Sequence, residues 1–171
     1  MKSPAELNAI ASRVQGIIFD VDGVLTDGRI IYSDDGTEQK QFHVQDGASL
    51  KLLAHHGIEV AIITGRESVM VTRRAAELGI THIMQGVGAK DAALMRLMAA
   101  GFPGQSLAAV GDDIQDLALF DHASVDLAIT VPNAHPAILK RADFTTQRNG
   151  GCGVAVEIAE LLLKAQGKWS F

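Results

Sequence analysis

Residues Gly16–Gly28 read GIIFDVDGVLTDG and combine a short apolar run with a polar turn. Its apolar run Ile17–Phe19 has the character of a buried strand, yet it ends directly in Asp20 and Asp22, two carboxylates two positions apart. A short apolar run bounded by polar turn residues is typical of a strand that is covered on both faces of a parallel sheet. The stretch therefore predicts a central strand with two acidic side chains at its carboxyl end.

Short apolar runs alternate with helical patterns along the rest of the chain. Further strands are expected near 59–65, 82–84, 106–113 and 125–129, and helices over 4–14, 47–56, 67–78, 89–100, 114–120, from 136 onward and over 154–165. This alternation predicts an α/β fold with a doubly wound, Rossmann-like parallel sheet and helices on both faces. Between 28 and 44, two β-rich arms flank Asp34-Asp35-Gly36, which predicts a β-hairpin flap, because Asp-Gly tolerates the positive φ of a tight turn.

The composition fits one compact soluble domain over residues 1–171, with 47% hydrophobic and 20% charged residues. A formal net charge of -5 argues against nucleic-acid and acidic-membrane partners, since phosphate-binding surfaces collect Lys and Arg. No apolar run approaches the ~20 residues of a membrane span. Cys152 is the only cysteine, and the first residues lack the apolar core of a signal peptide, so we expect a cytoplasmic setting.

Polar side chains follow three of the predicted strands. Asp20 and Asp22 follow the first strand, Thr64 and Gly65 follow the second, and the run LAAV leads into Asp112, Asp113 and Asp116. In open α/β sheets the ligand lies at the carboxyl ends of the strands, so these groups are expected to meet. Two like charges ~4 Å apart repel by roughly 4 kcal/mol at an effective dielectric of ~20, so such a cluster requires cations. Mg²⁺ suits carboxylate oxygens and phosphate, and Lys90 offers a second positive charge.

This set of residues suits phosphoryl transfer. Asp20 would attack phosphorus as an ionised carboxylate, and Asp22 would protonate the leaving oxygen and then activate water. Thr64 and the backbone N–H groups at the strand-to-helix turns would hydrogen-bond phosphate oxygens. Two carboxylates can thus perform a two-step hydrolysis.

Ordinary structural roles stay open for some of the same residues. Asp112 and Asp113 would also serve as N-caps of the helix that follows them. Asp116 would fit equally well as an acidic residue in the first turn of that helix. Lys90, taken alone, has the character of a solvated helix residue.

Four motifs in order, DVDGVLTDG, ITGR, the single Lys90 and GDDIQD, resemble those of the haloacid dehalogenase superfamily of phosphatases. The resemblance covers nearly the whole chain. It implies that Asp20 is the nucleophile that becomes an aspartyl phosphate and that Asp22 is the general acid/base. It also implies that Thr64, Gly65 and Lys90 bind the phosphoryl group.

The same resemblance implies a Mg²⁺ site. Asp20, the backbone carbonyl of Asp22, and Asp112 would be its ligands. Asp113 and Asp116 would support these ligands as an outer shell around the metal.

The spacing of the motifs leaves no room for the cap domain that members of this superfamily often carry. Within the capless branch, the stretches 25–47, 134–136, 148–153 and 161–168 look like the 3-deoxy-D-manno-octulosonate 8-phosphate phosphatase family. That resemblance implies a homotetramer in which the hairpins pack together and each active site is covered by a neighbour. It also implies a role in lipopolysaccharide synthesis.

The substrate positions depart from the family pattern. Gln45 and Val156 stand where the family usually shows Arg, and Arg is a natural clamp for a sugar-acid carboxylate. The candidates for substrate contact are His43, Asp46, Arg66 and Arg148. An N-acylneuraminate or deaminoneuraminate 9-phosphate is the alternative substrate. A phospho-receiver domain, which the late position of the GDD pair argues against, and an inactive assembly module are alternatives of a different class.

Overall fold

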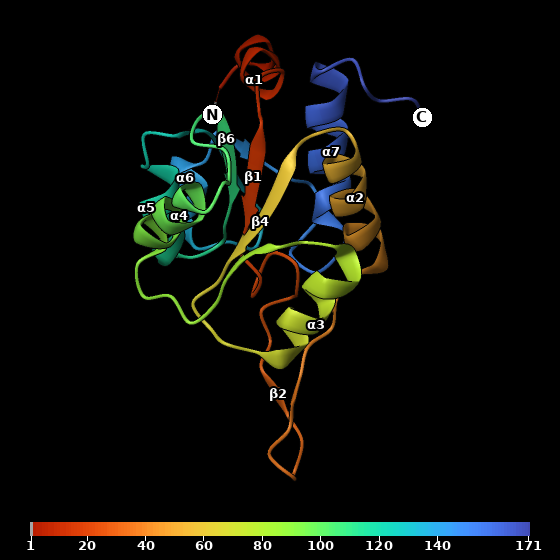
Figure 1. Cartoon of the computed structure of the whole chain (residues 1–171), viewed down its shortest axis with the longest axis vertical. Coiled ribbons are helices and arrows are strands. Elements are labelled where there is room, and N and C mark those ends of the chain that lie inside the picture. Colours follow the sequence, from red (N-terminus) through yellow and green to blue (C-terminus); the bar gives the residue numbers. More distant parts are fainter. Residues whose placement is uncertain (1) are drawn as a thin grey trace.

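The computed structural model describes residues 2–171 and is built around a six-stranded parallel sheet of order β5-β4-β1-β6-β7-β8 (Figure 1). The strands are β1 Gly16–Phe19, β4 Glu59–Ile63, β5 His82–Met84, β6 Leu107–Val110, β7 Val125–Thr130 and β8 Phe144–Thr145. From β1 the chain adds β4 and β5 on one side and then β6, β7 and β8 on the other. The order of winding therefore reverses beside β1, and a ligand site is expected at its carboxyl end.

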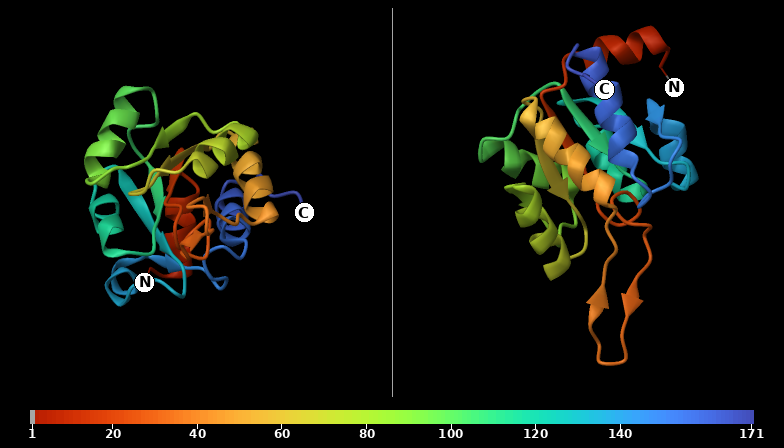
Figure 2. Two further views of the ribbon diagram at one scale, coloured as in Figure 1. Left: turned by 90° about the horizontal axis from the view of Figure 1, so that it is seen from below. Right: turned by 90° about the vertical axis from the view of Figure 1, so that its right-hand side faces the viewer.

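Helices cover both faces of the sheet (Figures 1 and 2). One face carries α2 Val44–His55, α3 Val69–Leu78 and α7 Val154–Ala165, and the other carries α4 Lys90–Ala99, α5 Leu117–Phe120 and α6 Pro136–Arg141. Helix α1 Pro4–Ala11 precedes β1, and the 3-10 turn η1 Ile114–Asp116 precedes α5. The predicted doubly wound α/β fold is confirmed, and only the two-residue strand β8, too short to show a periodicity, was not predicted. Within residues 2–171, none of the helices combines the length and apolar character that crossing a bilayer requires.

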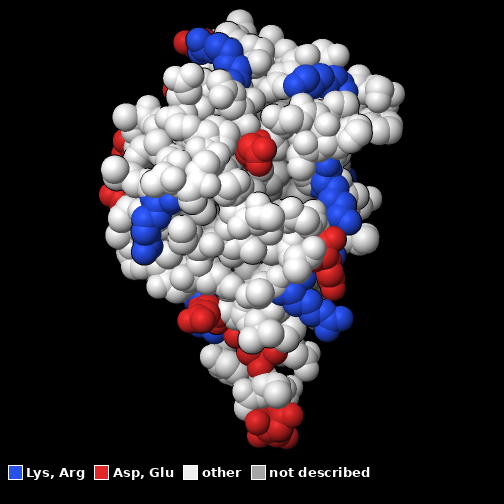
Figure 3. Space-filling model, viewed as in Figure 1, with Lys and Arg blue, Asp and Glu red and all other residues white. Residues whose placement is uncertain are grey.

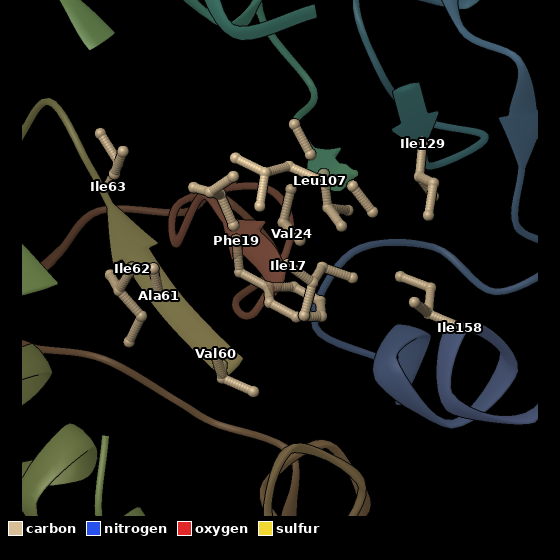
Figure 4. Packing of buried hydrophobic residues seen from close by; sticks show 14 of the residues in the cluster. Ile17, Phe19, Val24, Val60, Ala61, Ile62, Ile63, Leu107, Ile129 and Ile158 are labelled. Atoms are coloured by element: carbon tan, nitrogen blue, oxygen red, sulfur yellow. The ribbon is translucent and has the colours of Figure 1, made fainter. Parts of the chain in front are cut away.

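The central strand is anchored by its apolar residues. All of β1 is buried, and Ile17 and Phe19 have no exposed surface. Figure 4 shows these side chains among residues of the neighbouring strands and of α7, such as Leu107 and Ile158. Burying a side chain of this size contributes roughly 1.5–3 kcal/mol. The apolar run therefore fixes the place of Asp20, the next residue in the chain.

Two helices begin away from their predicted positions because of their caps. Helix α2 begins at Val44, earlier than expected, since Nδ1 of His43 accepts a hydrogen bond of 3.3 Å from the backbone N–H of Gln45. Helix α3 begins at Val69, later than expected, behind Ser68 as its N-cap. Side-chain hydrogen bonds, which hydrophobic periodicity does not report, therefore set both starting points.

The hairpin projects beyond the carboxyl edge of the sheet (Figure 2). Its short strands β2 Ile31–Tyr32 and β3 Glu38–Gln39 pair antiparallel, and Gly36 has a φ of 83° in the connecting turn. The predicted Asp-Gly hairpin is confirmed. Figure 3 shows acidic side chains at its tip, where Asp34 and Asp35 are exposed.

Candidate active site

The carboxyl ends of β1, β4 and β6 open into one cavity of about 340 Å³. Its lining includes residues from all four motifs: Asp20, Asp22, Thr64, Gly65, Arg66, Lys90, Asp112, Asp113 and Asp116. Gly28, at the entry to the hairpin, and Gln115 complete it. The fold thus brings together the polar groups that follow separate strands in the sequence.

Asp20 lies buried where β1 ends. Its Oδ1 atom is 3.0 Å from Nζ of Lys90, but it accepts no well-aligned hydrogen bond within residues 2–171. Burial, followed by the nearby charge of Asp116, raises the pKa of Asp20 to about 6 against the opposing effect of Lys90. The ionised form of this carboxylate therefore requires additional positive charge.

Lys90 is a buried residue at the start of α4, not a solvated one. Its Nζ atom donates a hydrogen bond of 2.5 Å to Oδ1 of Asp116. The other oxygen of Asp116 accepts hydrogen bonds from the backbone N–H groups of Asp112 and Asp113, at 2.9 and 3.0 Å. Burial alone would lower the pKa of Lys90, but the charges of Asp20 and Asp116 outweigh it and raise the pKa. Asp116 therefore uses both oxygens to fix Lys90 and the GDD turn.

The two acidic residues of the GDD turn differ in their contacts. Asp113 accepts a hydrogen bond of 2.7 Å from the backbone N–H of Ile114, so it caps η1 as an ordinary N-cap does. The Oδ1 atom of Asp112 is buried and has no hydrogen-bond partner in residues 2–171. Burial, and then the charge of Asp20, raises the pKa of Asp112 to about 7. Asp112 thus resembles Asp20 in needing a cation.

The acidic cluster fits a hard divalent cation. One carboxylate oxygen from each of Asp20, Asp112 and Asp116 lies within 4.8 Å of the others. Within residues 2–171, the buried Oδ1 atoms of Asp20 and Asp112 accept no hydrogen bond, although Nζ of Lys90 lies 3.0 Å from that of Asp20, whereas both oxygens of Asp116 are hydrogen-bonded. Oxygen ligands of this kind suit Mg²⁺. The direct metal contacts of Asp20 and Asp112, and the supporting role of Asp116, remain predictions that this geometry accommodates.

The side chain of Asp22 contacts the base of the hairpin. Its Oδ1 atom accepts a hydrogen bond from Nζ of Lys40, and its Oδ2 atom lies 3.8 Å from Nε of Arg66. Glu38 joins the group, 3.6 Å from Nζ of Lys40 and 2.9 Å from Nη2 of Arg66. Sequence reasoning missed Lys40 and Glu38, because the polar run that holds them shows no periodicity or spacing that would indicate a site.

Thr64 and Gly65 directly follow β4 and line the same cavity as Lys90. The backbone N–H of Thr64 donates to the carbonyl of Met84 on β5, which fixes the turn. A Cβ atom on Gly65 would lie 3.0 Å from Oε1 of Gln115, so glycine leaves room for that side chain. Phosphoryl binding by these residues remains a prediction.

The predicted substrate contacts fall into two groups. Arg66 lines the Asp20 cavity. His43 and Asp46 instead line a small apolar pocket beside the turn after β1, and burial raises the pKa of Asp46. Arg148 donates a hydrogen bond of 3.1 Å to Oε1 of Gln45 and lines a third depression. His43, Asp46 and Arg148 therefore lie outside the lining of the Asp20 cavity, and their contact with substrate remains a prediction.

The fold and the site define a class of hydrolase. The sequence profile of the haloacid dehalogenase-like hydrolases matches residues 80–158, which include Lys90 and the GDD turn. The remaining motifs, including Asp20 and Asp22, lie on the neighbouring strand ends of the same sheet. The order of winding and the acidic cavity at the switch point agree with this class.

Individual relatives narrow the assignment. The chain is 42% identical over 165 residues to the 3-deoxy-D-manno-octulosonate 8-phosphate phosphatase KdsC of Escherichia coli, covering 96% of this chain and 87% of the relative. It resembles the phosphatase of that name from Moraxella catarrhalis, solved in complex with magnesium ion, phosphate ion and a KDO molecule (TM-score 0.90, 43% identity, 96% and 94% of the two chains). The cobalt-bound deoxy-D-mannose-octulosonate 8-phosphate phosphatase from Haemophilus influenzae is also similar (TM-score 0.86, 37% identity, 93% and 92%). The chain belongs to the 3-deoxy-D-manno-octulosonate 8-phosphate phosphatase family of haloacid dehalogenase-like hydrolases.

Proposed function

We propose that this protein is a Mg²⁺-dependent phosphatase that releases phosphate from 3-deoxy-D-manno-octulosonate 8-phosphate. The observation that carries the proposal is the convergence of Asp20, Asp22, Lys90 and Asp112 on one cavity at the switch point of the sheet. The substrate follows from the relatives, one of which is 42% identical across 96% of the chain.

In the first step, a carboxylate oxygen of Asp20 forms a bond to phosphorus while the bond from phosphorus to the sugar oxygen breaks. The leaving oxygen takes the electron pair of that bond and a proton from Asp22. In the second step, a water oxygen attacks phosphorus and gives its proton to Asp22. The bond to Asp20 then breaks, and inorganic phosphate leaves with both aspartates restored.

The other cavity residues would bind charge. Asp20, the backbone carbonyl of Asp22, and Asp112 would hold Mg²⁺, which when bound neutralises the carboxylates and makes the phosphoryl group more electrophilic. Lys90 contributes a buried positive charge within 3.0 Å of Asp20. Thr64 and the backbone of Gly65 would donate hydrogen bonds to phosphoryl oxygens.

We propose further that the protein works as a cytoplasmic homotetramer in the synthesis of lipopolysaccharide. The hairpin supports the assembly, because Ile30 and Tyr32 on it are 49% and 65% exposed and, within residues 2–171, its two short strands pair only with each other. A neighbouring hairpin would shelter the Asp20 cavity, and excluding water strengthens the electrostatic interactions inside. The single cysteine, Cys152, which has no disulfide partner, is consistent with a reducing compartment.

Phosphate release from a panel of substrates tests this function. The panel comprises 3-deoxy-D-manno-octulosonate 8-phosphate, N-acetylneuraminate and deaminoneuraminate 9-phosphates, and p-nitrophenyl phosphate, each with Mg²⁺ and with excess chelator. We expect the highest kcat/KM for the octulosonate and no turnover with chelator. Asp20→Asn should reduce turnover by at least about 10³-fold, whereas Asp126→Asn, at an exposed position on β7, should retain it. Absence of hydrolysis across the panel, or full activity of Asp20→Asn, would show that the proposed function is wrong.

A further inference from the structure

The hairpin contacts Asp22, a residue of the active-site cavity, through a buried lysine. Lys40 follows β3 at the base of the hairpin, and only 2% of its side chain is exposed. Its Nζ atom donates to Oδ1 of Asp22 and lies 3.6 Å from Oε1 of Glu38. A lysine is almost never this buried unless it is paired, so its position depends on these carboxylates.

We propose that Lys40 is a positioning residue for Asp22, an inference that rests on the proposed phosphatase function. Nζ of Lys40 donates a hydrogen bond to Oδ1 of Asp22. Oγ1 of Thr26 donates to the same oxygen at 3.5 Å. With one oxygen fixed on two sides, the other oxygen, Oδ2, is the one that exchanges the proton with the leaving oxygen and with water. The hairpin is thereby part of the catalytic machinery of its own subunit.

The contact is compatible with both protonation states that the reaction requires of Asp22. A protonated carboxyl group with its proton on Oδ2 still presents Oδ1 as a carbonyl oxygen that accepts from Lys40. After the proton has left, the same hydrogen bond becomes a charge-assisted pair. Lys40 can therefore hold Asp22 in one orientation through the complete cycle.

Arg66 contacts the same two carboxylates as Lys40, namely Glu38 and Asp22. Nη2 of Arg66 donates a hydrogen bond of 2.9 Å to Glu38, while its Nε atom lies 3.8 Å from Oδ2 of Asp22. Two cations and two carboxylates thus alternate in one cluster beside the cavity, so Lys40 adds no uncompensated charge. The arrangement also ties the segment after β4 to the hairpin, two parts of the chain that the sheet does not join.

A positioning role predicts that the effect of losing Lys40 depends on the leaving group. A sugar alkoxide requires a proton from Asp22 as it departs, whereas p-nitrophenolate departs without one. The constant kcat/KM reports only the steps up to departure of the leaving group, so it excludes the later reaction of water. A purely structural defect would lower kcat/KM for both substrates equally.

Lys40→Met tests the proposal, with Gln41→Met as the matched control, because Gln41 is the next residue and is exposed. We expect kcat/KM of Lys40→Met to fall by roughly 10- to 100-fold for 3-deoxy-D-manno-octulosonate 8-phosphate and by less than about 3-fold for p-nitrophenyl phosphate. Gln41→Met should match the wild type on both substrates. Equal losses on the two substrates, or no loss on either, would overturn the positioning role.

A second variant covers the case in which Lys40→Met fails to fold. Lys40→Gln keeps a hydrogen-bond donor for Oδ1 of Asp22 without the charge, and we expect the same split between the two substrates with a smaller loss. An inactive wild type would contradict the proposed function itself. An active wild type with unselective Lys40 variants would contradict only the role of Lys40.

Discussion

The ammonium group of Lys90 lies 2.5 Å from Oδ1 of Asp116, and both side chains are almost completely removed from solvent. The same ammonium lies 3.0 Å from Oδ1 of Asp20, so one buried cation serves two carboxylates. Removing one partner of a buried pair leaves an uncompensated charge, which typically costs about 3–5 kcal/mol. We therefore expect Lys90→Met to lower the free energy of unfolding by about 3–5 kcal/mol in urea titrations of the metal-free protein.

Lys51→Met, at an exposed position on α2, serves as the control and should change stability by less than about 0.5 kcal/mol. The double variant Lys90→Met/Asp116→Asn removes both charges of the pair. It should be more stable than the sum of the two single losses predicts. Strict additivity would mean that the two residues do not interact.

The raised pKa values of Asp20, about 6, and Asp112, about 7, predict how stability depends on pH. Each carboxyl group binds its proton more tightly in the folded state than in the unfolded state, where its pKa is near 3.8. Their contribution to stability is therefore complete below pH 3.8 and is lost as the pH rises to about 7. Mg²⁺ binds the ionised form, so the increase in melting temperature that it produces should be larger at about pH 7.5 than at about pH 5.

Thermal melts at both pH values, with Mg²⁺ and with chelator, measure this effect. Asp112→Asn removes the group with the higher pKa and one predicted ligand. It should flatten the pH dependence of the metal-free protein above about pH 6 and reduce the response to Mg²⁺. A Mg²⁺ response in this variant as large as that of the wild type would exclude Asp112 as a ligand.

Gly150 packs directly against the turn that carries Asp22. A Cβ atom at this position would lie 1.7 Å from the backbone oxygen of Gly23, so Gly150→Ala must displace one of the two loops. We expect a loss of about 1–3 kcal/mol in stability and a fall in kcat/KM of up to about 10²-fold, because the catalytic groups lose their alignment.

Gly104→Ala is the matched control, since its Cβ would meet only the methyl of Met98 at 3.6 Å, an ordinary contact. Urea unfolding and phosphate release are measured on both variants. If Gly150→Ala had the stability and kcat/KM of the wild type, the Gly-rich turn would be able to shift without cost and would not support the site.

The proposed tetramer predicts a dependence on the apolar face of the hairpin. Tyr32→Asp should shift the protein from a four-chain species to smaller species in sedimentation velocity at micromolar concentration, because a charge would be buried between subunits. Met95→Lys, at a 62% exposed apolar position on α4, should leave the assembly unchanged. A monomeric wild type would remove the tetramer from the proposal.

The alternation of strands and helices, the hairpin and the polar strand ends could all be predicted from the sequence alone. These features are predictable because the burial of Ile17–Phe19, the Asp-Gly turn and the polar residues after each apolar run are local patterns. The topology rule for doubly wound sheets then places Asp20 near Asp112, although the two are far apart in the chain. Positions that depend on individual side-chain hydrogen bonds, such as the start of α2 behind His43, were beyond these patterns.

The pairing of the charged side chains, in contrast, depends on the tertiary structure. Lys40 and Asp22 are 18 positions apart and become partners because the strand that ends the hairpin returns to the turn after β1. His43 and Arg148 lie outside the lining of the Asp20 cavity, and within residues 2–171 the buried Oδ1 atom of Asp112 has no hydrogen-bond partner. Hydrophobic periodicity reports which face of an element is buried, but the distance between two side chains depends on how distant loops close. The sequence therefore determined the chemistry that this chain can perform, and the fold decided how its acids and cations are paired.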